Sequence, residues 1–335
     1  MADSDAAAWR WLSAEPNGVL AMLVALQPHD SVALDDEKTP APSELPLAIR
    51  SVVLVMELAL VSGGAFLLLL TSSVAGTLVR SLLHAVSDDE MVLEDAVVQT
   101  CEAVVFGWGL VSLMNWFFRR PKRDLVRRLS RFGLDGVKTC ILSVLLHSIA
   151  TIGIVFSQES SGDQVLVSWQ NLQSAVRRPD GSLFTEELMQ NLLFAPMKEE
   201  LLFRGLNVLV TINRLRSIKC SAFISSLAFT AIHLVNFRRL GTRYSSSYLA
   251  FQLLWASLVG MFLALKFALS GSLIECFVLH TINNVFALSV SKTVFVVLTQ
   301  PRICCTVFAA LSVYAVAIFR QLQTSGRTTI SAKQR

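Results

Sequence analysis

Two glutamates and an arginine stand inside the apolar run "NLLFAPMKEELLFRGL", residues 191–206. Ionisable side chains are costly to bury in an apolar span, so those that are kept there are candidates for a function. In a helix that turns about 100° per residue, Glu200 and Arg204 lie on one face, while Glu199 points about 100° away from Glu200. The spacing therefore predicts a Glu200–Arg204 ion pair and leaves Glu199 facing a different wall.

Two histidines elsewhere in apolar segments each have a partner one helical turn away. "FTAIHL" pairs Phe229 with His233, and "HTINNV" pairs His280 with Asn284. A carboxylate and an imidazole can together hold and deprotonate a water, and an asparagine amide can donate to a developing oxyanion. By contrast, His147 in "VLLHSIA" has no such motif around it, and we expect it to be a packing residue.

The same residues also permit metal chemistry. Glu199, His233 and His280 form a His₂Glu set, which is the composition of many hydrolytic zinc sites that keep a water in the fourth position. The spacing does not exclude zinc. We prefer a metal-free site without a cofactor, because Asn284 is a poor zinc ligand but a good oxyanion donor.

The composition indicates which elements position these residues. The 335-residue chain is 53% hydrophobic and 16% charged, which is typical of a multi-spanning membrane protein and gives no support to nucleic-acid binding. Long unbroken apolar runs disfavour a β-barrel. We expect an all-α polytopic bundle of about eight transmembrane helices, near residues 51–74, 96–118, 136–156, 186–210, 218–237, 247–270, 272–291 and 303–319.

Charge patterning suggests an orientation and a further candidate site. The basic loop "RRPKRDLVRRLSR" (119–131) marks the cytoplasmic side, whereas "NFRRLGTR" (236–243) falls on the other side by the count of spans. The second cluster, Arg238, Arg239 and Arg243, follows the His233 helix. Its arginines could meet the free carboxylate of a substrate, or they could contact lipid headgroups.

The motifs EExxxR, FxxxH and HxxxN, in this order on successive apolar helices, resemble the CAAX protease and bacteriocin-processing family, which includes the type II CAAX prenyl endopeptidases. The resemblance covers roughly residues 185–290. It implies a glutamate-type intramembrane endopeptidase that acts on prenylated CAAX proteins or peptides in a lipid bilayer, in the endoplasmic reticulum membrane. It also leans towards a metal-free mechanism.

The resemblance also implies a role for each motif residue. Glu199 is the expected general base on a water that His233 helps to hold, and His280 and Asn284 are the expected oxyanion donors. Supporting roles fall to Glu200, Arg204 and Phe229. The chain then divides into a cytosolic or interfacial segment with a linker (1–46), N-terminal transmembrane helices (47–182), the protease core (183–291), and a last helix with a basic tail (292–335).

Two other functions stay open at this stage. Prenyl endopeptidases tend to carry extra histidines just after the FxxxH histidine, whereas this chain reads "HLVNF", which is closer to the broader family. A protease acting on a non-prenylated membrane substrate is therefore an alternative. A transporter or channel would also use intramembrane Glu and His, but the sequence shows no internal repeat and no matched pair of helices broken by Gly or Pro.

Overall fold

The computed structural model describes residues 47–86, 94–118, 132–158, 165–178, 181–183, 188–215 and 217–333. The N-terminal segment 1–46 and the basic loop 119–131, on which the expected orientation rests, lie outside the described residues.

The described part of the chain is a helical bundle, as the composition predicts. Its elements are α3 (Leu47–Val86), α4 (Glu94–Phe118), α6 (Leu134–Ser157), α7 (Trp169–Val176), the π-helix η1 (Gln190–Phe194), α9 (Ala195–Glu200), the π-helix η2 (Leu201–Val208), α10 (Leu209–Leu215), α11 (Ile218–Ile232), the 3₁₀-helix η3 (His233–Arg239), α12 (Ser246–Ser270), α13 (Leu273–Ala287) and α14 (Pro301–Lys333).

All eight expected spans fall on helical segments, but six of them are long and apolar enough to cross a membrane by length and composition. The fourth is the run from η1 to α10, which π-turns interrupt. The seventh, α13, has 15 residues and begins just after a tight turn at Gly271. Gly271 has φ 67°, a left-handed conformation that glycine adopts at little cost, and Ser272 then caps the new helix by accepting from the Glu275 amide.

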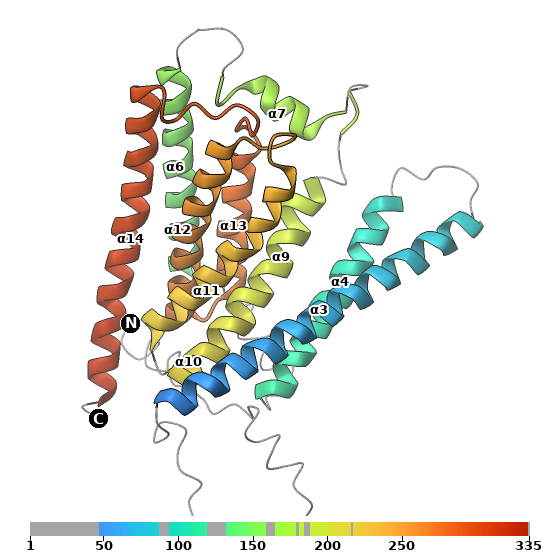
Figure 1. The fold of residues 1–335 in the computed structure, drawn as a ribbon, viewed down its shortest axis with the longest axis vertical. Coiled ribbons are helices and arrows are strands. Elements are labelled where there is room, and N and C mark those ends of the chain that lie inside the picture. The colour runs from blue at the N-terminus through green and yellow to red at the C-terminus, as the bar shows by residue number, and fades with distance from the viewer. Residues whose placement is uncertain are drawn as a thin grey trace, which may run out of the picture.

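The helices form two groups with the glutamate-bearing segment between them (Figure 1). The long helices α3 and α4 lie side by side, and α6, α12, α13 and α14 gather on the other side of α9, α10 and α11. One buried apolar cluster joins both groups and includes Val61, Phe106, Leu206, Val259 and Leu279. The segment that carries Glu199 and Glu200 is therefore packed from both sides.

The π-turns on either side of α9 are fastened to neighbouring helices by side-chain hydrogen bonds. Thr281 Oγ1 of α13 donates to Leu192 O of η1 at 2.9 Å, and Ser225 Oγ of α11 donates to Phe203 O of η2 at 2.9 Å. Irregular turns at membrane depth need such partners, and π-turns often occur at functional sites. These bonds fix α11 and α13, which carry the two motif histidines, against the glutamates.

Candidate active site

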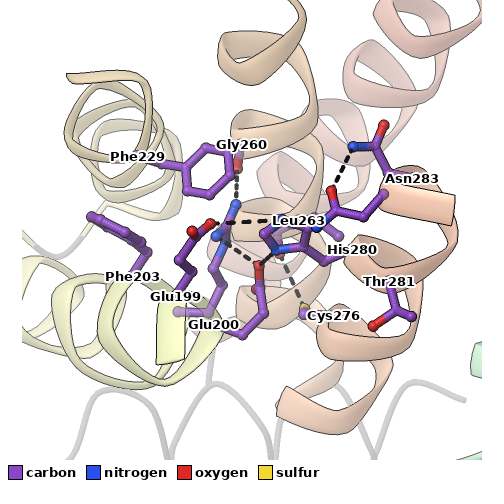
Figure 2. A network of polar contacts seen from close by, with 12 residues as sticks. Glu199, Glu200, Phe203, Phe229, Gly260, Leu263, Cys276, His280, Thr281 and Asn283 are labelled. Atoms are coloured by element: carbon purple, nitrogen blue, oxygen red, sulfur yellow. Dashed lines mark hydrogen bonds and ion pairs between the residues drawn. The ribbon is translucent and has the colours of Figure 1, made fainter. Parts of the chain in front are cut away.

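Glu200 joins two of the three motifs. Its side chain is buried, and Oε1 lies 2.8 Å from Arg204 Nη1 and 2.7 Å from His280 Nδ1 (Figure 2). The i, i+4 spacing predicts the first of these contacts, and the structure confirms it. An ionised carboxylate only accepts hydrogen bonds, so His280 donates the proton on Nδ1. Glu200 thereby sets both the orientation and the tautomer of the imidazole.

Arg204 is held by more than its carboxylate partner. Its guanidinium carbon lies 4.4 Å from the centre of the Phe229 ring, and Nη2 donates to Gly260 O at 3.5 Å. A Cβ atom at Gly260 would lie 3.1 Å from the Phe229 ring, so a glycine permits this close approach of α11 and α12. The cation–π contact with Phe229 therefore helps to hold the Arg204 guanidinium beside Glu200.

Glu199 meets the other nitrogen of the same imidazole. Its carboxyl Oε2 lies 3.7 Å from His280 Nε2, and 27% of its side chain is exposed. This separation is longer than a hydrogen bond and is one that a water can bridge. Glu199 and Glu200 therefore approach one imidazole from two sides, at different ring nitrogens, a shared partner that the helical spacing did not predict.

The remaining motif residues meet at one cavity. His233 lies where α11 passes into η3, and its Nδ1 is 2.9 Å from Phe229 O. His233, His280 and Asn284 line a cavity of about 200 Å³, whose other walls are mostly apolar and include Ile154, Phe251, Trp255, Val290 and Val307. We call this the apolar cavity. Glu199 lies beside it, next to His280.

Asn284 is oriented by residues that lie outside the three motifs. Its Nδ2 donates to Asn191 O of η1 at 2.8 Å, its Oδ1 accepts from Asn283 Nδ2 at 3.4 Å, and Asn283 Oδ1 accepts from Trp255 Nε1 at 2.6 Å. An amide nitrogen has two N–H donors, so one stays available for another acceptor. The sequence signal was the second asparagine in "HTINN"; nothing local indicates its indole partner.

We expect Trp255→Phe to lower kcat of a hydrolytic reaction at this site by about fivefold to tenfold. The substitution removes one neutral hydrogen bond, typically worth about 1 kcal/mol, and loosens the amide that Asn284 presents. Steady-state kinetics of the purified variant would check it. Because phenylalanine keeps an aromatic ring beside Phe251 and Tyr314, an unchanged kcat would show that the indole N–H does not position Asn284.

His147 also lines the apolar cavity, and its ring packs against buried neighbours. It is buried, its ring stacks on Phe286 with centroids 5.1 Å apart, and its Nδ1 lies 2.8 Å from Ser143 O one turn away. These contacts agree with the packing role expected for it.

The zinc alternative can be compared with this geometry. Among the residues that the structure describes, no group of three or more His, Cys, Asp or Glu side chains lies close enough to hold a metal ion. His280 directs Nδ1 at Glu200, and Nδ1 of His233 is engaged with a backbone carbonyl. Both bonds engage Nδ1, and metal-ligating histidines commonly make such bonds with the ring nitrogen that does not bind the metal, so these contacts do not decide between the zinc and the metal-free mechanism.

The three arginines after the His233 helix are all exposed. Arg238 and Arg239 end η3, and Arg243 also lines a second cavity together with Lys198, the residue before Glu199. Of the three, Arg243 thus lies against the segment that carries the catalytic candidates.

Comparison with known proteins gives one family. Residues 182–286 match the family model described as type II CAAX prenyl endopeptidase Rce1-like. No curated protein and no solved structure gives a significant match. The matched range spans Glu199, Glu200, Arg204, His233, His280 and Asn284 and agrees with the residues that the motifs single out. Through residues 182–286, which make up less than half of its length, the chain is therefore similar to the type II CAAX prenyl endopeptidase Rce1-like family.

Proposed function

We propose that the protein hydrolyses the peptide bond after the prenylated cysteine of CAAX proteins and releases the last three residues. The observation that carries the proposal is the apolar cavity, which adjoins a carboxylate–imidazole pair at membrane depth. A prenyl chain needs an apolar volume next to the scissile bond, and the walls at Phe251, Trp255 and Val307 supply one. By the same resemblance, we propose the endoplasmic reticulum as its membrane.

In the proposed mechanism, Glu199 takes a proton from a water that His233 helps to hold, and the oxygen attacks the carbonyl carbon of the prenylcysteine. Glu199 Oε2 and His280 Nε2 are 3.7 Å apart, too far for a direct hydrogen bond, and a water to one side of the line that joins them can bond both. The carbonyl oxygen becomes an oxyanion as the tetrahedral intermediate forms. The C–N bond then breaks, and Glu199 returns the proton to the leaving amine.

The proposed oxyanion donors are Asn284 and His280. Asn284 has a second N–H beyond the one that Asn191 uses, and His280 Nε2 donates when the ring carries both protons. Glu200, bonded to Nδ1, holds that ring in place. Donors fixed in advance by bonds to other helices suit this task, because they need little rearrangement when charge develops.

The test of this proposal compares two peptides of one CAAX sequence, one farnesylated and one unmodified, with purified protein in detergent. We expect cleavage of the farnesylated peptide after its cysteine and much weaker cleavage of the unmodified one. Equal cleavage of both would remove the prenyl requirement and favour a non-prenylated membrane substrate. Cleavage of neither peptide would contradict the proposed function.

We propose that the reaction needs no metal, and we expect turnover to persist after treatment with a strong zinc chelator. A zinc mechanism would require deprotonated ligands around one zinc ion. The activity would then disappear on chelation and return with added Zn²⁺. Cleavage assays before and after chelation, with metal content measured on the same sample, separate the two mechanisms. Loss of activity that Zn²⁺ restores would contradict the metal-free assignment.

A further inference from the structure

A second cavity lies on the other side of the glutamate-bearing segment. It has a volume of about 430 Å³ and is bounded by the ends of α3 and α4, by η1 and α9, and by the turn before α12. Its polar walls come from Arg80, Gln99, Glu102, Gln190, Asn191, Lys198 and Arg243, so it holds three cationic side chains and one carboxylate. We call it the polar cavity.

The polar cavity shares a wall with the catalytic candidates. Lys198 lines it, while the next residue, Glu199, contacts His280. Asn191 also lines it, and the carbonyl of Asn191 accepts the hydrogen bond from Asn284 Nδ2. The apolar cavity begins at His280 and Asn284. A substrate chain that runs from the apolar cavity past His280 and Asn284 therefore passes next to the polar cavity.

The charges in the polar cavity are unevenly compensated. Arg80 is 2.5 Å from Asp95 and 3.5 Å from Glu94, and Lys198 is 3.9 Å from Glu102. Within the described ranges, no carboxylate forms an ion pair with Arg243. An anion entering this cavity would meet Arg243 without displacing an ion pair between described residues.

The leaving segment of the proposed substrate carries such an anion. Three extended residues span about 10 Å, so the C-terminal carboxylate lies about that far beyond the scissile bond. A guanidinium can bind a carboxylate through two parallel hydrogen bonds, which fixes direction as well as charge. An internal segment of a protein chain has no main-chain carboxylate at this place, so recognition of that group would limit cleavage to chain ends.

We propose that Arg243 binds the C-terminal carboxylate of the substrate in the polar cavity and thereby sets the distance from the chain end at which the bond is cut. The proposal rests on the proposed function. It gives the substrate a defined direction, with the prenyl group in the apolar cavity and the chain end in the polar cavity. Arg243 is then a residue that determines specificity.

The experiment measures kcat/KM for one farnesylated peptide made as the free acid and as the C-terminal amide. For the unmodified protein we expect the acid to be preferred by about 10-fold to 100-fold, the range for one hydrogen bond between charged groups. Arg243→Gln should lose most of this preference through a higher KM for the acid, with kcat/KM for the amide unchanged. Arg243→Lys should restore part of it.

Arg302→Gln is the matched control, since Arg302 is an exposed arginine at the start of α14, outside both cavities. It should keep the preference for the acid. An acid-to-amide ratio that Arg243→Gln leaves unchanged would overturn the inference while the proposed function stands. Failure of the unmodified protein to cleave either peptide would overturn both.

Discussion

The Glu199→Gln variant should lose cleavage of a farnesylated CAAX peptide by about 10³-fold or more and keep its thermal stability. Glutamine has almost the same shape as glutamate but cannot accept the proton of the attacking water, and general bases contribute roughly 10²-fold to 10⁴-fold to rates. The side chain is 27% exposed, and its nearest charged neighbour, His280 Nε2, is 3.7 Å away. Little of the fold should therefore depend on its charge.

Glu275→Gln provides the matched control for this prediction. Glu275 is another glutamate among apolar helices, buried and paired with Lys266 at 2.9 Å, outside both cavities. Its substitution should lower the melting temperature in detergent and leave kcat close to that of the unmodified protein. If Glu199→Gln instead kept more than a tenth of the normal turnover, Glu199 would not be the general base.

The Arg204→Met variant should be strongly destabilised, by about 3–5 kcal/mol, because it leaves the buried Glu200 without its cation. Arg204 and Glu200 are both fully buried, and their 2.8 Å pair lies in the apolar interior. Within the described residues, Glu200 Oε2 and Arg204 Nε have no hydrogen-bond partner, so the pair is not fully satisfied. Thermal unfolding in detergent micelles measures the loss.

The double variant Glu200→Gln with Arg204→Met separates stability from function. It removes both charges, so most of the lost stability should return. Activity should not return, because the carboxylate that bonds His280 Nδ1 is absent. A single Arg204→Met variant as stable as the unmodified protein would show that Glu200 does not depend on this ion pair.

The sequence predicts the contacts that lie within one helix better than those between helices. The Glu200–Arg204 pair and the ring contact of Phe229 with His233, 5.0 Å between centroids, both follow from i, i+4 spacing. The eight helical segments follow from the apolar runs. Local geometry is enough for these features, because each depends on residues a turn apart or on average hydropathy.

The contacts of His280 could be identified only from the tertiary structure. That Glu199 and Glu200 share its imidazole depends on how α13 docks against α9, which lies between two π-turns. The hydrogen bonds that link Trp255, Asn283 and Asn284 likewise cross from α12 to α13. No spacing rule indicates partners that come from different helices.

The proposed mechanism is tested most directly by incubating the purified protein with a farnesylated CAAX peptide in H₂¹⁸O and determining the masses of both products by mass spectrometry. We expect an intact C-terminal tripeptide without ¹⁸O and a farnesylcysteine product that carries one ¹⁸O in its new carboxyl group, with neither product formed by the Glu199→Gln variant. A cut at any other bond, or the same products from that variant, would contradict this mechanism.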